Sequence, residues 1–452
     1  MHSLPLTPFE ESFYVDDSPA YPWNILFRLC FAGALCRELW QQAAASVLPR
    51  HPLLYARVRR TWCGRYRWHW PTDGASECEP LLHWNRHSLG IDPSLQRLPL
   101  EQGTAWETWA AVEGDRSEAV LHFHHAAVDG IAAARFISEL LVAYDAHASG
   151  RTPQLPPLEP QRLARRDKYG YTPWKYLCRA RKLSVGLAGV RQFIGRGAVS
   201  AVPHQPVVRS QSLPADYPAT NSHVFGVAES QALRNAARSA DTTLNNLLAR
   251  DLFRALHRWR RELGLPGDDD QWLRISVPMN MRRPGDDSLP AANVASIVFL
   301  DRRSPQITAG GDTLLRGIHD EINLIKDNDL GMVFLLSLRA SSILPGMLAR
   351  AAKKQQFACA AAFSNLVRPL DGLPLSQDDG RYRVGPLRLD DFEFYPPVRP
   401  RTCVSIGVLS YADRLRICLQ TDPRFVARPD AESLLATYVE EVRRSACAIA
   451  IA

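Results

Sequence analysis

The sequence predicts an α/β protein of two lobes joined by a linker. Its 452 residues exceed the ~100–200 of an ordinary single domain, and a hydrophobic content of 46% is enough for large cores. Segments with strand and helix patterns alternate in both halves, which favours sheets covered by helices. We place an N-terminal lobe at residues 1–150, a linker at 151–220 and a C-terminal lobe at 221–452.

The N-terminal lobe shows alternating elements. Residues 37–48 have a helical pattern, and two short strands are expected at 53–60 and 65–70 around the Cys63-Gly64 turn. A strand-like run at 118–124 precedes an apolar-striped helix at 131–146. Four tryptophans at strand-like spacings are expected to pack in the core or against a sheet face: Trp62, Trp68, Trp70 and Trp84.

The linker combines a proline-rich stretch, 151–160, with a strongly basic one, 161–196. The basic stretch holds ten Lys or Arg against a single acid, Asp167, so its net charge is +9. The whole chain carries +7, so the remaining residues sum to −2. We expect either a solvated linker or a surface for anionic partners, namely the phosphates of coenzyme A, an acidic acyl carrier protein or an anionic membrane face. A possible helix face is formed by Lys175, Arg179 and Lys182. Nucleic acid is disfavoured, because no nucleic-acid-binding fold accompanies the charge.

The C-terminal lobe again shows mixed patterns. Strands are expected at 222–228, 272–278 and 293–300, helices at 229–239, 243–264 and within 312–352, and mainly strands in the last ninety residues.

Several protein classes lack support in the sequence. The N-terminus does not resemble a secretory signal, and no apolar run reaches the ~18 residues of a transmembrane helix. Nine cysteines without a C-x-x-C pair favour free thiols in a reducing compartment, so we expect a cytoplasmic protein. The glycine-rich loops that bind nucleotide phosphates are missing.

One stretch carries the chemistry, Glu118-Ala-Val-Leu-His-Phe-His124-His125-Ala-Ala-Val-Asp129-Gly130. Side chains alternate along a strand, so His122 and His124 face one side and His125 the other. Asp129-Gly130 signals a turn and a helix start. A histidine at a strand end suits general-base work. The alternative is a metal site built from the His-x-His pair, but packed, hydrogen-bonded imidazoles are the expected state, with no metal.

The residues 124–130 match the HHxxxDG signature, and five other segments support the match in order: Pro5-Leu-Thr-Pro, Thr243-Leu-Asn-Asn-Leu-Leu248, Ser276-Val-Pro-Met-Asn-Met-Arg282 with Asn293-Val-Ala-Ser296, Phe363-Ser-Asn-Leu366, and Ser410-Tyr-Ala-Asp-Arg-Leu415. The chain thus resembles the acyltransferase superfamily of chloramphenicol acetyltransferase, which includes condensation domains, wax ester synthases and polyketide-associated acyltransferases. One departure is Asn245-Asn246, where many wax-synthase-like members have Asn-Asp.

The resemblance implies two chloramphenicol-acetyltransferase-like lobes, each a mixed sheet with helices, forming a V around a central tunnel. It implies that His125 is the general base and His124 is structural. Asp129 would form a buried ion pair with Arg282, and Gly130 would leave room for the thioester arm. Candidates for the oxyanion site or the tunnel wall are Ser364, Asn365 and Asn245.

The expected function is that of a free-standing acyltransferase without metal or redox cofactor. The donor would be a thioester, on coenzyme A or on the phosphopantetheine of an acyl carrier protein, and the acceptor a small-molecule alcohol or amine. Two alternatives remain: a catalytically silent, condensation-like module that docks carrier proteins, and a metal-dependent hydrolase. Peripheral membrane contact through 161–196 also stays open.

Overall fold

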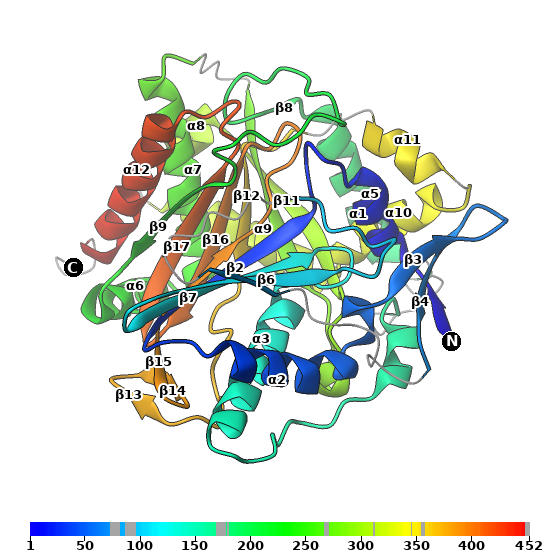
Figure 1. The fold of residues 1–452 in the computed structure, drawn as a ribbon. Helices are drawn as coiled ribbons and strands as arrows, with labels where there is room; N and C mark the ends of the chain where they lie inside the picture. The colour runs from blue at the N-terminus through cyan, green and yellow to red at the C-terminus, as the bar shows by residue number, and fades with distance from the viewer. Residues whose placement is uncertain are drawn as a thin grey trace.

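The N-terminal lobe is built on a mixed sheet with helices on one face (Figure 1). The computed structural model describes residues 1–72, 82–85, 96–168, 178, 180–265, 271–310, 312–344, 346–353 and 358–447. In sheet order the strands are β13 (Gln377–Asp378), β14 (Arg381–Val384), β15 (Leu387–Tyr395), β2 (Asn24–Ala32), β7 (Arg116–His124), β6 (Trp106–Glu113) and β5 (Leu82–Asn85). Helices α2 (Arg37–Val47) and α3 (Gly130–Ala148) share a hydrophobic core with this sheet.

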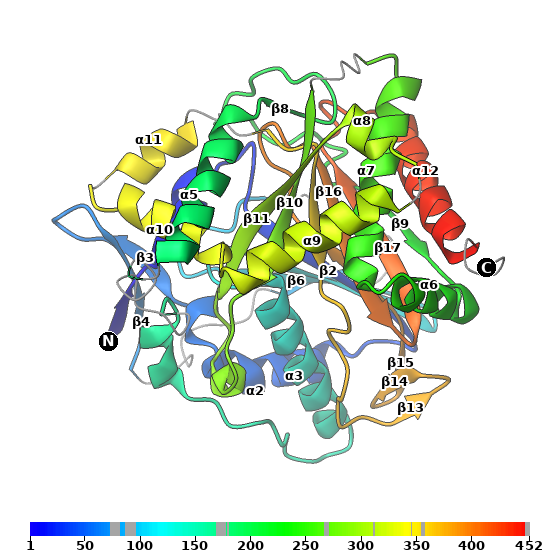
Figure 2. The same ribbon diagram turned by 180° about the vertical axis from the view of Figure 1, so that it is seen from behind.

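The C-terminal lobe repeats this plan with a second mixed sheet, whose strands lie towards the viewer in Figure 2. Its strands are, in order, β11 (Ala295–Arg303), β10 (Trp272–Asn280), β12 (Ala361–Asn365), β16 (Val404–Tyr411), β17 (Arg414–Thr421) and β9 (Ala219–Val224), with β8 (Ala198–Val199) pairing β10. Its covering helices are α6 (Val227–Ser239), α7 (Leu244–Glu262), α9 (Thr313–Asp327) and α12 (Arg428–Cys447). The predicted fold class, two lobes each made of a mixed sheet with helices, is confirmed.

Smaller elements surround the two lobes. A separate antiparallel sheet contains β1 (His2–Pro5), β4 (Tyr66–Trp70) and β3 (Arg57–Arg60). In the part of the chain that the structure describes, the remaining helices are α1 (Pro8–Asp16), α5 (Ala180–Gly195), α8 (Ser304–Ile307), α10 (Gly331–Ser341) and α11 (Met347–Lys353), with 3₁₀ turns at Leu48–Arg50, Pro52–Leu54, Pro160–Arg165 and Asp286–Ser288. Among the described residues, no helix is both long and apolar enough to cross a membrane.

The two lobes exchange chain segments. Strand β15 pairs antiparallel with β2, so the range 221–452 supplies β13, β14 and β15 to the N-terminal sheet. Where the sheets meet, a Cβ on Gly407 of β16 would lie 2.0 Å from the carbonyl oxygen of Phe394. Only glycine allows that approach. The predicted range 221–452 therefore contains strands of both sheets.

Part of the predicted linker is built into the fold. Arg166 is 5% exposed and forms a bidentate ion pair with the buried Glu10 of α1, with Nε–Oε1 and Nη2–Oε2 distances of 2.6 Å. Helix α5 is tied to the C-terminal lobe by the ion pair of Lys182 with Asp329, and Arg196, the residue after the helix, pairs with Asp301. At these positions the basic segment is a structural element and not a solvated linker. Lys175 and Arg179 lie outside the described residues.

Candidate active site

Strand β7 carries His125 to the seam between the lobes. The antiparallel pairing of β7 with β2 sets His124 opposite Asn24, and the next residue leaves the strand. The backbone N–H of His125 donates to the carbonyl of Trp23 over 2.7 Å, which continues the pairing by one residue. His125 is half-buried there, at the end of the strand, as the strand pattern predicted.

The protonation of the His125 ring follows from its contacts. Nδ1 lies 3.1 Å from the carbonyl oxygen of Val128. Nδ2 of Asn293 also lies 3.3 Å from Nδ1, but it makes its shorter hydrogen bond, 2.7 Å, to the His125 carbonyl. We therefore assign the tautomer from the Val128 contact: a carbonyl oxygen only accepts, so Nδ1 carries the hydrogen and Nε2 keeps its lone pair. No described residue forms a hydrogen bond to Nε2. The imidazole therefore presents a basic nitrogen whose tautomer is fixed by the protein.

Aromatic rings enclose the same imidazole. Phe13 of α1 stacks on it with ring centroids 4.5 Å apart and planes at 28°, and Trp23 meets it edge-on at 5.7 Å. This burial lowers the pKa of His125 to about 4, and the charge of Asp129 opposes the shift without cancelling it. The ring is thus neutral throughout the physiological pH range.

Asp129 joins the two lobes. One carboxylate oxygen caps α3 by accepting from the backbone N–H of Ala132 at 2.9 Å. The other accepts from Nη1 of Arg282 at 2.8 Å and from the backbone N–H of Val294 at 2.7 Å. The structure thus brings Asp129 and Arg282 into contact, as the resemblance implied. Both carboxylate oxygens are engaged by these contacts, so the contacts of Asp129 are structural.

Asn293 is a site residue to which the sequence reasoning assigned no role. It is fully buried, and its Nδ2 donates to the backbone carbonyl of His125 at 2.7 Å. The histidine loop is therefore held from the C-terminal lobe at two consecutive positions, Asn293 and Val294. The Asn293-Val-Ala-Ser296 motif marked Asn293 as part of a family block, but the sequence did not show that Asn293 binds the His125 backbone. Phe13 and Trp23 were missed for the same reason.

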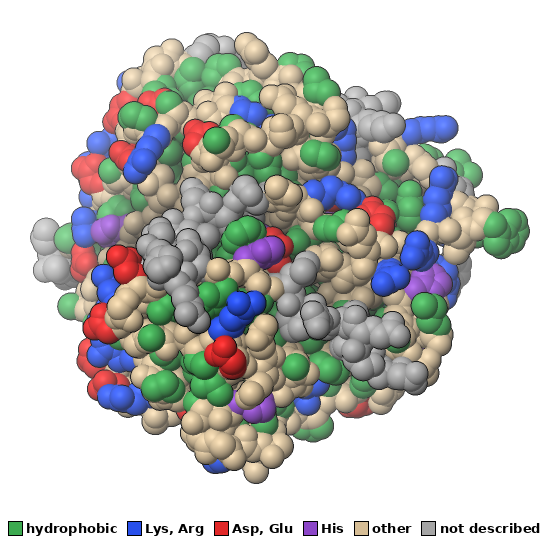
Figure 3. Space-filling view, viewed as in Figure 1, with side chains coloured by type: hydrophobic (Ala, Val, Ile, Leu, Met, Phe, Trp, Pro, Cys, Tyr) green, Lys and Arg blue, Asp and Glu red, His purple; other side chains and the backbone are tan. Residues whose placement is uncertain are grey.

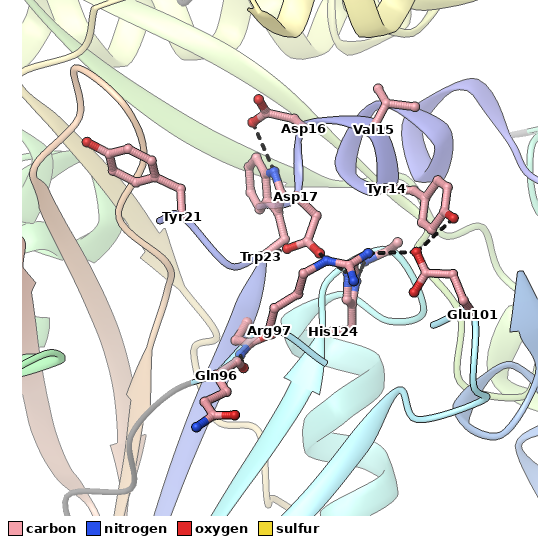
Figure 4. A network of polar contacts seen from close by, with 12 residues as sticks. Tyr14, Val15, Asp16, Asp17, Tyr21, Trp23, Gln96, Arg97, Glu101 and His124 are labelled. Atoms are coloured by element: carbon pink, nitrogen blue, oxygen red, sulfur yellow. Dashed lines mark hydrogen bonds and ion pairs between the residues drawn. The ribbon is translucent and has the colours of Figure 1, made fainter. Parts of the chain in front are cut away.

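His122 and His124 each face a different carboxylate. Nδ1 of His124 accepts from the backbone N–H of Ala126 at 3.1 Å, and its Nε2 faces the buried Asp17 at 3.5 Å (Figure 4). Nδ1 of His122 lies 3.1 Å from Glu107. His122 and His124 therefore do not converge on a shared point, and the described residues contain no cluster of three or more side chains suited to a metal.

Asp17 anchors the wall of the site behind His124. Figure 4 shows it between His124, Arg97 and Trp23, and it accepts from the backbone N–H of Trp23 at 2.9 Å. Burial acts to raise the pKa of Asp17, but the neighbouring His124 and Arg97 outweigh it and hold that pKa below its usual value. A charged Asp17 thus holds both His124 and the backbone of Trp23, whose ring packs against His125.

The predicted oxyanion candidates lie on β12 and at the start of α7. Asn365 and Asn245 contact each other, with Nδ2 of Asn365 3.3 Å from Oδ1 of Asn245. Side chains alternate along β12, so Ser364 shares a face with Leu366, which packs against Gly130. Of the three, Ser364 is therefore on the face turned towards the histidine motif. Among the described contacts, none links these residues directly to His125.

Gly130 is covered by the C-terminal half of the chain. A Cβ there would lie 2.9 Å from Cδ2 of Leu366 and 3.3 Å from Cζ of Phe394. The resemblance implied room for a thioester arm at this glycine. In this structure the space beside its Cα is taken by those two side chains, so the arm would have to displace Leu366 or pass elsewhere.

The close packing at Gly130 gives a testable contrast with Gly189 on α5. Gly130→Ala is expected to lower the free energy of unfolding by ~1–3 kcal/mol, because Leu366 must move. Gly189→Ala meets nothing within 4 Å and is expected to raise it by ~0.5–1 kcal/mol through helix propensity. Chemical denaturation of both variants measures the difference. Equal effects would show that Leu366 does not fill this space.

Among the comparisons with known proteins, those with solved structures show the fold. No family model matches the chain. Two uncharacterized proteins from strains of Mycobacterium tuberculosis are 23% identical over 359 residues, covering 77% of this chain and 78% of each relative. Among solved structures, the starter condensation domain of rhizomide synthetase, in complex with C8-CoA and Leu-SNAC, aligns with a TM-score of 0.68 at 14% identity over 98% of this chain and 94% of its own.

Two further solved structures align almost as well. The first condensation domain of the CDA synthetase gives a TM-score of 0.66 at 15% identity, covering 98% of this chain and 96% of that one. The epimerization domain from the third module of tyrocidine synthetase B gives 0.65 at 14% identity, covering 98% and 97%. The chain as a whole therefore has the fold of these peptide-synthetase domains.

Proposed function

We propose that this chain, which has the fold of a condensation domain, is an acyltransferase that moves an acyl group from a thioester to an alcohol or amine. The fold is shared with a starter condensation domain whose structure contains C8-CoA and an aminoacyl thioester analogue. The donor is an acyl-CoA or an acyl carrier protein, the acceptor is a small molecule, and the chemistry uses no metal or redox cofactor.

One observation carries the proposal: His125 has a fixed tautomer with Nε2 left for substrate. Nδ1 is engaged by Val128, the backbone is held by Trp23 and Asn293, and the ring is clamped by Phe13. A base held in this way is already oriented when substrate arrives. Such positioned proton transfer contributes ~10²–10⁴-fold to a reaction rate.

The reaction balances with the residues at hand. Nε2 of His125 takes the proton of the acceptor O–H or N–H as that atom attacks the thioester carbonyl carbon. The carbonyl becomes a tetrahedral oxyanion, for which a hydrogen-bond donor is needed, and Ser364 is our candidate from its place on β12. When the carbonyl re-forms, the C–S bond breaks and the leaving thiolate takes the proton from the imidazolium.

Product analysis tests the proposal. The full chain is incubated with acyl-CoAs of increasing length, the same acyl groups on a carrier protein, and a panel of alcohols and amines, and products are identified by mass spectrometry. We expect an ester or amide together with stoichiometric free thiol. Carrier-protein binding without turnover of any donor would instead favour the silent docking module, and turnover abolished by chelators would favour the hydrolase.

The lowered pKa of His125 predicts an unusual pH profile. An ordinary histidine loses its basic form below pH ~6.5, whereas here the neutral form persists down to a pKa of about 4. The base is therefore present above pH 5, and kcat/KM is expected to stay level from pH 5.5 to 8. Its acid limb should fall below pH 5, with circular dichroism recorded at each pH to separate it from unfolding. A limb near pH 6.5 would contradict the burial of the ring.

A further inference from the structure

One tryptophan lies where the sequence did not predict it. Trp68 and Trp70 are buried, as expected, but Trp62, at the turn between β3 and β4, is 100% exposed. Figure 3 shows a hydrophobic group projecting from the rim of the molecule at the hairpin tip, with Lys or Arg side chains nearby. An indole is amphipathic and concentrates at membrane–water interfaces, so its full exposure in water calls for a partner.

A second apolar turn lies beside the first. Between α10 and α11, Ile343 is 65% exposed, Leu344 61% and Met347 37%. The two turns are connected, because Nη2 of Arg65 donates to the carbonyl of Ile343 at 3.4 Å. Three large aliphatic side chains and an indole are thus exposed together at one end of the molecule.

Helix α5 extends this end. Leu187 and Ile194 on its outer side are 60% and 74% exposed. The helix is anchored by a tilted contact of Phe193 with Phe299, whose ring centroids lie 4.7 Å apart, and both ribbon views place it next to α10 (Figures 1 and 2). We call the two turns and this helix the apolar end, formed by residues 57–67, by residues 180–196 and by the described residues of 331–350, which are 331–344 and 346–350.

The charge of the apolar end has one sign. Residues 57–67 contain five arginines, and in all three segments there is no Asp or Glu. Some of the cations are neutralised from outside, as Lys182 is by Asp329. Arg59, Arg60, Arg191 and Arg350 are exposed and form no ion pair with any described residue.

From this pattern we propose that the apolar end is a docking surface for an anionic lipid bilayer. Exposed indole and aliphatic tips enter the interfacial region, while arginines around them bind lipid phosphates, often through two parallel hydrogen bonds. An acidic protein would match the arginines alone. A bilayer supplies negative charge and an apolar layer to three separate segments at once. The membrane contact thus lies mainly on the two turns, and only its α5 part coincides with the predicted 161–196.

The docking surface is connected to the histidine site through one helix. Phe334 of α10 meets Phe9 of α1 edge-on at 5.9 Å, and Phe13 of the same α1 stacks on His125. If the protein docks through its apolar end, helix α1 would therefore lie directly behind the docked surface, between that surface and His125. The docking itself is independent of the acyltransfer chemistry and is tested without it.

Vesicle sedimentation tests the proposal with the full chain. We expect the wild type to bind vesicles of phosphatidylcholine with phosphatidylglycerol, bind pure phosphatidylcholine weakly, and release as salt rises. Trp62→Ser with Leu344→Ser should lower the partition coefficient at least about tenfold. Arg59→Gln with Arg60→Gln should lower binding to the anionic vesicles by about fivefold per arginine and leave the weak neutral binding unchanged.

Matched controls keep the outcome clear. Val227 of α6 is 50% exposed outside the apolar end, and Val227→Ser should bind like the wild type. Brominated lipid should quench tryptophan emission in the wild type and less so in Trp62→Phe, which reports insertion directly. The proposal is overturned if the Trp62/Leu344 variant binds like the wild type, or if the wild type ignores anionic vesicles at low salt and binds an acidic carrier protein instead.

Discussion

Replacing His125 by alanine is expected to lower kcat/KM by ~10²–10⁴-fold while the protein stays folded. The loop should keep its shape, because the bonds to Trp23 and Asn293 use the backbone of residue 125 and survive the substitution. The lost group is the one whose Nε2 would take the acceptor proton. Turnover of the preferred donor and acceptor pair, with single-turnover rates, measures the effect.

The matched control is His223→Ala. His223 lies on β9, where its side chain contacts Arg443 and Phe225, and its removal should leave kcat/KM unchanged. A folded His125→Ala variant with wild-type turnover would falsify the assignment of the base. If neither protein turns over any donor but both bind a carrier protein equally, the docking alternative holds.

Removal of the Asp129 carboxylate is expected to cost ~3–5 kcal/mol in the free energy of unfolding. Asp129→Ala leaves Arg282, whose side chain is only 16% exposed, without its acidic partner, and it also strips the cap from α3 and the acceptor from the N–H of Val294. Activity should fall along with stability, because Val294 follows the residue that holds His125. Chemical denaturation gives the value.

A double-mutant cycle separates the ion pair from the cap. Once Asp129 is alanine, Arg282→Ala should cost little more, since the uncompensated charge is gone. The exposed pair of Arg258 with Glu262 offers a comparison at 2.9 Å, where Glu262→Ala should change stability by less than ~1 kcal/mol. An Asp129→Ala cost no larger than that of Glu262→Ala would show that the inter-lobe contact carries little stability.

The elements predicted best are those whose signals are local. The helix expected at 131–146 is α3, and its start follows from Asp129, whose carboxylate caps the N–H of Ala132. The strand expected at 222–228 was placed too late, because Glu229 reaches back to the N–H of Gly226 at 2.9 Å and starts α6 at Val227. That capping contact overrode the alternating pattern.

Two other predictions missed where a residue lies in the fold. Arg166 belongs to a stretch whose basic composition is typical of a solvated linker, but it forms a buried ion pair with Glu10, 156 residues away. Trp62 has the spacing of a packed strand residue but lies at a turn that extends into solvent. Composition and spacing do not distinguish these residues from their neighbours in the chain. Their burial or exposure is decided by their position in the fold.

By itself, the sequence determined the two-lobe α/β class, the strand that ends just before His125, the helix that begins after Asp129 and the motif from which acyl transfer is proposed. Periodicity and helix capping depend on residues a few positions apart, so they can be recognised in the sequence alone. Only the tertiary structure decided that β15 pairs with β2, that Asn293 and Val294 hold the histidine loop, and that an apolar end gathers from three segments. Each of these depends on residues far apart in the chain meeting in space, where strand register, burial and charge act together.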